Sequence, residues 1–136
     1  MPIEDDKRIE AILRTAQTVA VVGASPKAGR DSGTIAQFLA GRGYKVIPVN
    51  PIYPEVFGMK CYRDLKSIGT KVDIVDVFRR SEEVLPIVEE AIAIGAGTIW
   101  MQLDVVNIEA ARRAEEAGLH VIMDRCIAIE HRRLLK

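Results

Sequence analysis

Short runs of apolar residues alternate along the chain with longer segments in which apolar residues recur every three or four positions. The short runs are rich in β-branched residues and predict strands. Most of them lack the strict polar alternation of a sheet face that meets water, so we expect both faces of these strands to be buried, as in a parallel sheet. The five predicted strands cover residues 18–23, 45–49, 72–78, 97–103 and 119–123.

The longer segments have the apolar period of amphipathic helices. Gly43, Gly95 and Gly118 stand at the ends of three of them, where the left-handed residue that follows a helix favours glycine. Ser81, followed by two glutamates, has the composition of a helix start. The predicted helices cover residues 33–42, 81–94 and 105–117, with two flanking helices at 4–16 and 126–135.

Strands that alternate with helices predict right-handed crossovers and a parallel sheet covered on both faces. We therefore expect an α/β fold, a three-layer Rossmann-type doubly wound sheet with strand order 3-2-1-4-5, forming a single domain over residues 1–136. The longest irregular connection covers residues 50–62, with a short strand near Lys60–Tyr62. A connection of this length often carries function.

Composition narrows the function classes. Of the 136 residues, 49% are hydrophobic, which is enough apolar material for a core without disulfide or metal staples. The 19 basic residues balance the 19 acidic ones, for a formal net charge of +0. No overall field therefore attracts the protein to nucleic acid or to an anionic membrane. An anionic ligand has to be held by a local cluster of donors.

Two cysteines, Cys61 and Cys126, are too few for a disulfide scaffold or a four-thiolate metal site, and they fit a reducing cytoplasm. The polar, acidic N-terminal segment does not resemble a signal peptide, and no stretch approaches a membrane span. We expect a cytoplasmic protein without a bound metal. His120 and His131 have no second type of metal ligand at suitable spacing, which favours structural roles for both.

The segment after the first predicted strand has the composition of an anion-binding loop. Gly23 ends the strand and small residues follow it. Ligands of open parallel sheets bind at the carboxyl ends of the strands, where a helix N-terminus directs backbone N–H groups at an anion. The alternative is a solvated turn that needs its glycines for geometry alone. The candidate side-chain donors of this loop are Ser25, Lys27, Arg30 and Ser32.

The loop meets the dinucleotide fingerprint G-x-G-x-x-G only in its first glycine. Ser25 and Ala28 occupy the second and third glycine positions. The end of the second predicted strand also lacks the ribose-binding carboxylate of an NAD site, because no Asp or Glu lies between Gln37 and Pro54. An NADP site needs a basic residue there, and residues 46–59 contain none. The sequence thus disfavours nicotinamide cofactors, and it has no Walker A motif.

Three stretches together resemble the coenzyme A-binding domain family. They are Val-Val-Gly-Ala-Ser at 21–25, Val-Ile-Pro-Val-Asn-Pro at 46–51 with Gly58 and Tyr62 downstream, and the tail at 123–131. The resemblance covers about residues 10–135. The same domain forms the N-terminal part of the succinyl-CoA synthetase α subunit and of NDP-forming acyl-CoA synthetases. The tail is similar to that of stand-alone members.

The resemblance implies a Rossmann-type domain that holds the adenosine 3′-phosphate 5′-diphosphate part of CoA across the strand ends. The phosphohistidine of the ligases lies in a second domain, which these residues do not match, so ligase activity is not implied. By position, the residues implied to border CoA are Gly23, Ala24 and Ser25, then Asn50 and Pro51, then Val77, Phe78, Arg79 and Arg80, and finally Met101 and Gln102.

Several of these residues have a structural interpretation as well. Arg79 and Arg80 suit phosphate oxygens, or they pair with Glu82 and Glu83 in a solvated loop. At least one of Trp100 and Met101 is expected in the core. The Arg112–Arg113 and Arg132–Arg133 pairs are typical of solvated helix faces, and without interleaved aromatic residues they do not indicate an RNA-binding surface.

Cys126 has two interpretations. Unpaired cysteine is often a buried, purely structural residue. Cys126 also follows the fifth predicted strand, opens the terminal helix and stands next to Arg125, a position that favours a reactive thiolate near the proposed crevice. The sequence therefore leaves a redox role for this thiol open.

The expected function is binding of coenzyme A or an acyl-CoA, in a carrier, sensor or buffering role without catalytic machinery of its own. The alternatives are an NAD(P)-linked oxidoreductase and the CoA-binding part of a ligase completed by another chain. We expect a small-molecule partner, and neither nucleic acid nor membrane. The sequence does not decide between a monomer and a homodimer.

Overall fold

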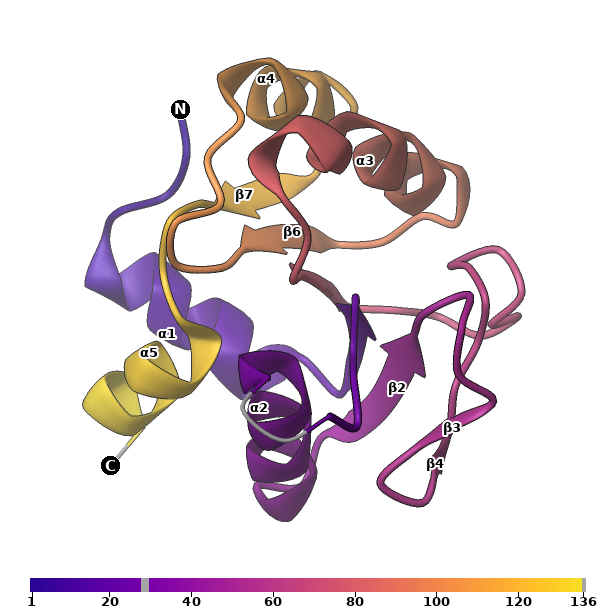
Figure 1. The fold of residues 1–136 in the computed structure, drawn as a ribbon. Coiled ribbons are helices and arrows are strands. Elements are labelled where there is room, and N and C mark those ends of the chain that lie inside the picture. The colour runs from indigo at the N-terminus through magenta and orange to yellow at the C-terminus, as the bar shows by residue number, and fades with distance from the viewer. Residues whose placement is uncertain (28–29, 136) are drawn as a thin grey trace.

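The computed structural model describes residues 1–27 and 30–135. Within these residues, five strands form one parallel sheet (Figure 1). This confirms the predicted doubly wound α/β fold. The strands are β1 (Thr18–Val22), β2 (Lys45–Val49), β5 (Ile74–Val77), β6 (Thr98–Met101) and β7 (His120–Ile122).

The expected strand order is wrong in one respect. The sheet runs β2-β1-β5-β6-β7, so the third strand of the sheet along the chain lies next to the first, and β2 lies at the edge. Pro48 explains the edge position, because proline cannot donate to a sheet ladder and is confined to edges. Its carbonyl oxygen faces outward and accepts a hydrogen bond from the Tyr62 N–H at 3.0 Å. At the start of β5, the Asp73 carboxylate accepts from the N–H groups of Gln17 and Thr18, which ties β5 to β1.

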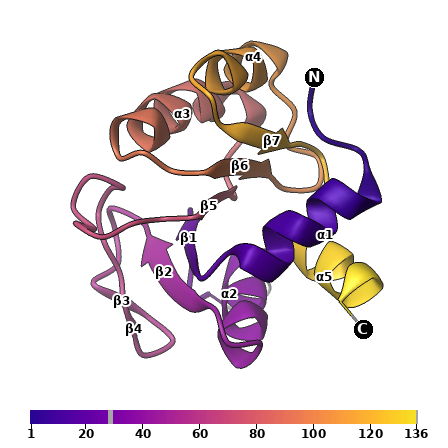
Figure 2. The same cartoon turned by 180° about the vertical axis from the view of Figure 1, so that it is seen from behind.

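Helices cover the sheet on both faces (Figures 1 and 2). One face packs against α1 (Asp6–Thr15), α2 (Asp31–Gly41) and α5 (Ile127–Leu134), through residues such as Ile9, Leu39 and Ile127. The other face packs against α3 (Val84–Ala93) and α4 (Ile108–Glu116), through residues such as Val88 and Ala114. The helix expected over 81–94 begins with a 3-10 turn at Ser81–Glu83.

The connection from β2 to β5 contains a small antiparallel hairpin of β3 (Glu55–Val56) and β4 (Met59–Lys60). Tyr62 then forms an isolated bridge with Val49, close to the short strand that the sequence predicts. The hairpin tip reaches the first turn of α2, because a Cβ placed on Gly33 would lie 2.5 Å from the Phe57 ring. Gly33 thus allows the hairpin to close against the start of α2.

The strand order fixes the place of the ligand crevice. From β1 the chain moves outward to β2, and from β5 it continues in the opposite direction through β6 to β7. In doubly wound sheets the crevice opens at such a switch point, beyond the carboxyl ends of the strands. Here these are the ends of β1 and β5. No helix in the described part of the chain is long and apolar enough to cross a membrane.

Candidate functional site

A cleft of about 960 Å³ lies at the switch point. Its walls come from the loops after β1, β5 and β6 and from the first turns of α2 and α5. Among the residues expected from the sequence, the cleft brings together Gly23, Ser25, Arg30, Ser32, Phe78, Arg79, Arg80, Gln102 and Cys126. The contact of each with a ligand stays a prediction.

Gly23 allows β1 and β5 to continue into the cleft side by side. Its φ of +92° lies in the left-handed region, which favours glycine. A Cβ at this position would lie 2.2 Å from the carbonyl oxygen of Phe78. The Phe78 N–H in turn donates to the Val22 oxygen at 2.8 Å. The end of β5 therefore packs directly against the glycine turn.

Side chains of the protein hold the loop after β1 in place. The Ser32 hydroxyl accepts a hydrogen bond from the Ser25 N–H at 3.1 Å, and the Ser25 hydroxyl accepts from the Lys27 N–H at 3.2 Å. The buried Asn50 amide donates to the Ala24 oxygen at 2.9 Å, and its own oxygen accepts from the Ile52 N–H. Asn50 therefore braces the loop from behind and is not part of the cleft wall.

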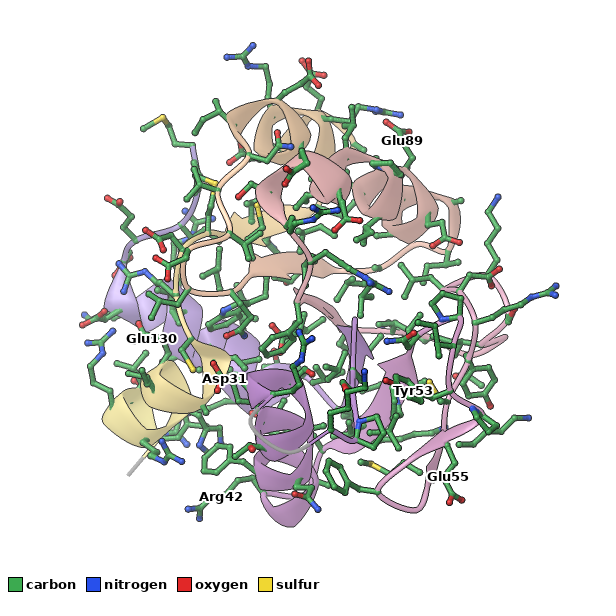
Figure 3. The ribbon with its side chains drawn as sticks, viewed as in Figure 1. Asp31, Arg42, Tyr53, Glu55, Glu89 and Glu130 are labelled. Atoms are coloured by element: carbon green, nitrogen blue, oxygen red, sulfur yellow. The ribbon has the colours of Figure 1, made fainter. Side chains whose placement is uncertain are left out.

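Two helices begin at the cleft. Arg30 is the N-cap of α2 and Cys126 is the N-cap of α5, and in the described structure neither side chain caps its helix. The first N–H groups of a helix lack intrahelical partners and carry partial positive charge. Figure 3 labels Asp31 at the start of α2, next to α5. Both helix starts thus face a common space that favours an anion.

Four arginines add positive charge to the cleft, against only two carboxylates, Asp31 and Glu83. Arg80 pairs with Glu83 at 3.4 Å, as the solvated-loop interpretation expected, yet both residues line the cleft. Within residues 1–27 and 30–135, the other three arginines form no ion pair. The arginines are Arg30, Arg79, Arg80 and Arg132.

Arg132 was assigned from the sequence to a solvated helix face. It is exposed, but it also lines the cleft. Its guanidinium lies 4.5 Å from the centre of the Phe38 ring on α2. The sequence gives no signal for this position, because the packing of α5 against α2 brings it there. Its neighbour Arg133 instead bridges Asp6 and the buried Glu130, and so ties α1 to α5.

Gln102 lies at the end of β6, lines the cleft and is only 4% exposed. Its amide nitrogen donates to Oδ1 of Asp76 on the neighbouring strand β5. Asp76 is fully buried, and burial raises the pKa of its carboxyl to about 8. Sequence reasoning missed Asp76. The available signal was a lone carboxylate inside the apolar run Ile74–Val77, since a charge is rarely buried without a role.

The remaining expected residues lie elsewhere. Val77 and Met101 are completely buried in the core, and so is Trp100, which confirms the core assignment on β6. Lys27 is exposed, and neither it nor Pro51 is part of the cleft wall.

The two cysteines differ in environment. Cys126 is half-buried at the cleft, next to Arg125, whose guanidinium binds Glu130 at 2.8 Å. Cys61 is buried, and desolvation raises the pKa of its thiol. Burial also lowers the pKa of His131, whose ring packs edge-on against Phe38 and Tyr44. No group of three or more potential metal ligands occurs in the described residues.

Comparison with known proteins gives matches over nearly the whole chain. YneT of Bacillus subtilis is 41% identical over 123 residues, which cover 90% of this chain and 91% of that protein. A protein of Pyrococcus horikoshii OT3 of known structure is 42% identical, with a TM-score of 0.96 and coverage of 100% of this chain and 97% of that one.

A third relative is the ADP-forming acetate–CoA ligase I of Archaeoglobus fulgidus, 29% identical over 123 residues. These cover 83% of this chain but only 18% of the ligase, so the similarity concerns a small part of that enzyme. The model of the CoA binding domain matches residues 17–132. The glycine turn, the switch-point cleft and this match together show that the chain belongs to the CoA binding domain family.

Proposed function

We propose that the cleft binds coenzyme A or an acyl-CoA, and that the protein carries, senses or buffers this ligand without catalysing a reaction on its own. The observation that carries the proposal is the concentration of positive charge. In a chain with no net charge, four arginines and two helix N-termini surround one cleft. Such a site selects a ligand with several negative charges close together.

The residues of the cleft fit the chemistry of CoA. Its phosphates match the guanidinium groups of Arg30, Arg79 and Arg132 and the free N–H groups of the helix starts. Its less polar parts match exposed apolar side chains of the rim, Leu103 and Ile129. When bound, CoA supplies a thiol that carries acyl groups as thioesters. The protein's own residues bind and orient the molecule.

A nicotinamide cofactor fits less well. Its adenosine ribose needs a carboxylate at the end of β2, and Asn50 and Pro51 stand there instead. The Asn50 amide is already engaged by the Ala24 oxygen and the Ile52 N–H. The missing carboxylate at the end of β2, the lack of a basic residue in 46–59 and the bracing role of Asn50 thus support CoA over NAD or NADP.

The similarity to part of an acetate–CoA ligase favours one alternative, a CoA-binding component of a ligase that another chain completes. Affinity capture of the tagged protein from its native host, followed by mass spectrometry, tests it. Recovery of a stoichiometric partner that forms acyl-CoA from CoA, a carboxylic acid and a nucleotide would favour the ligase component. Recovery of the protein alone with bound CoA would favour the carrier, sensor or buffering role.

The direct test is ligand-dependent thermal unfolding. We expect CoA to raise the melting temperature more than NAD, NADP or ATP at equal concentration. A ligand at 100 times its dissociation constant stabilises the native state by about 2.7 kcal/mol, which a thermal scan detects. The Arg30→Ala/Arg79→Ala double variant, which lacks two of the cleft cations, should lose most of the CoA-dependent shift. A larger shift with NAD or NADP than with CoA would refute the proposal.

A further inference from the structure

One buried acid lies next to the cleft without an evident structural task. Asp76 lies on β5, between Val21 of β1 and Trp100 of β6 in the sheet register, and is 0% exposed. Its Oδ1 accepts the hydrogen bond from Gln102. Its Oδ2 is fully buried and has no hydrogen-bond partner in the described part of the chain. A buried polar atom without a partner costs stability.

The hydrogen bond to Asp76 fixes the orientation of the Gln102 side chain. With the amide nitrogen engaged by Oδ1, the amide oxygen is the group left for other partners. Among the described residues, no protein group donates to this oxygen, and it is not one of the fully buried unpartnered atoms. Because Gln102 lines the cleft, its amide oxygen is a hydrogen-bond acceptor on the cleft wall.

We infer that Asp76 is a positioning residue, which holds the Gln102 amide so that its oxygen accepts a hydrogen bond from an N–H group of the ligand. This inference rests on the proposed function, since it takes the ligand to be CoA or an acyl-CoA. CoA has N–H donors at both ends, in the adenine amine and in the amides of the pantetheine arm. Most of the charged groups of the cleft, the four arginines and the two helix N-termini, are donors, so an acceptor held in a fixed direction adds a selective contact for such a group.

The energetics of the pair support a functional origin. An apolar residue of similar size in place of a buried, half-satisfied carboxyl is often neutral or stabilising. A residue that lowers stability where a simpler one would serve is typical of a functional site. At pH 7, Asp76 should therefore contribute to ligand affinity without a net gain in stability over an apolar residue, and these two quantities can be measured separately.

The experiment is a double-mutant cycle with Asp76→Leu and Gln102→Leu. CoA affinity is measured by calorimetry, and stability by urea unfolding. We expect each single variant to weaken CoA binding by about fivefold, as for the loss of one hydrogen bond. The double variant should bind as the weaker single variant does, because Asp76 acts only through Gln102. Asp76→Leu should unfold at the same urea concentration as the wild type, or at a higher one.

Two further variants test whether the loss of CoA affinity is specific to the hydrogen bond between Asp76 and Gln102. Asp76→Asn keeps an oxygen that accepts from the Gln102 amide, so it should restore CoA affinity to within about twofold of the wild type. Thr98→Val replaces another buried polar residue, at the opposite end of β6, and should leave CoA affinity unchanged. If Asp76→Leu does not fold, Asp76→Ala takes its place in the cycle.

Adenosine 3′,5′-bisphosphate distinguishes the two ends of CoA. If the Asp76 variants weaken the binding of adenosine 3′,5′-bisphosphate as much as that of CoA, the donor is the adenine amine. If they weaken only the binding of CoA, the donor is a pantetheine amide. Unchanged affinity for both ligands in Asp76→Leu, or additive losses in the double variant, would overturn the inference while the proposed function stands. A wild type that does not bind CoA would refute the proposed function, and the inference with it.

Discussion

At the scale of single residues, most of the positive charge of the cleft comes from arginine side chains that form no ion pair within the described residues. Arg30 and Arg79 come from the loops after β1 and β5, and neither forms an ion pair within the described residues. Unpaired guanidinium groups in one cleft repel each other, so an anion that lies between them is favoured. The sequence indicated these two residues, but it missed Arg132 and Asp76 because their positions depend on packing.

Arg30 is the residue whose removal tests the proposed anion site most directly. We expect Arg30→Ala to weaken CoA binding by about 1.5–3 kcal/mol, the contribution of a hydrogen bond to a charged group. The fold should be unchanged, because the Arg30 side chain makes no cap hydrogen bond. Calorimetric titration measures the effect. Arg63→Ala, which removes an exposed charge outside the cleft, is the matched control and should bind as the wild type does.

Cys126 is the second residue with a testable chemistry. Under oxidising conditions, we expect its thiolate to attack CoA disulfide, which forms a Cys126–CoA disulfide and releases one CoA thiol. Cys126 lines the cleft, whereas Cys61 is buried with a raised thiol pKa. Intact-protein mass after incubation should show the adduct in the wild type and in Cys61→Ser. An adduct that persists in Cys126→Ser and vanishes in Cys61→Ser would assign the reactivity to Cys61.

At the scale of elements, the end of β1 and the start of α2 are held by contacts on three sides. Phe78 packs against Gly23, Asn50 supports Ala24 from behind, and Phe57 of the β3–β4 hairpin packs against Gly33. Each contact comes from a different part of the chain. The orientation of the α2 N-terminus is therefore a property of several elements together.

A pair of glycine substitutions tests the contact between β1 and β5. Gly23→Ala should lower the free energy of unfolding by more than about 2 kcal/mol. The new Cβ would clash with the Phe78 oxygen, and the positive φ is strained for any residue other than glycine. Gly58→Ala is the matched control, since its φ is +78° and its Cβ would meet nothing within 4 Å. Urea unfolding of both variants gives the comparison. Equal losses would show that the φ angle alone, and not the close approach of β5, requires glycine at 23.

At the scale of the whole molecule, the absence of net charge contrasts with a local excess of positive charge at one end of the sheet. Elsewhere, Arg113 on α4 pairs with Glu89 on α3 at the surface. The buried Glu130 pairs with Arg125 and Arg133, and Arg133 also pairs with Asp6, so that these residues join α1 and α5. Figure 3 labels Glu89 and Glu130. Inside the sheet, Asp76 is a fully buried acid with one polar partner. It links the stability of the whole protein to pH.

The direction of this linkage follows from the raised pKa of Asp76, about 8 in the folded protein against an ordinary value of 3.8. Between these values the folded state holds a proton that the unfolded state releases. The free energy of unfolding that this bound proton adds is fully present at low pH. It is lost as the pH rises toward 8, by up to about 1.4 kcal/mol per pH unit. Relative to Asp76→Asn, the wild type should therefore become less stable from pH 5 to pH 8.

Urea unfolding of both proteins at several pH values measures this difference. The comparison cancels the opposing contribution of His131, whose lowered pKa makes the protein more stable as the pH rises through the ordinary histidine range. The comparison also cancels the contribution of acids with a lowered pKa, such as Glu130. Their contribution to the stability of the protein is lost only at low pH. A difference in unfolding free energy that stays constant from pH 5 to pH 8 would contradict the raised pKa of Asp76.

The sequence by itself determined the features that depend on local chemistry. Apolar periodicity placed the strands and helices, the glycine turn placed the candidate anion-binding loop, and the lack of a carboxylate near Asn50 disfavoured a nicotinamide site. Tertiary structure decided what depends on pairing between distant segments. The edge position of β2 follows from the outward-facing Pro48, and Asp76 meets Gln102, 26 residues away, only because β5 pairs with β6. Arg132 reaches the cleft because α5 packs on α2. Apolar periodicity and the residue preferences of turns depend on a few neighbouring residues. Strand order and helix docking are set by the packing of the whole chain.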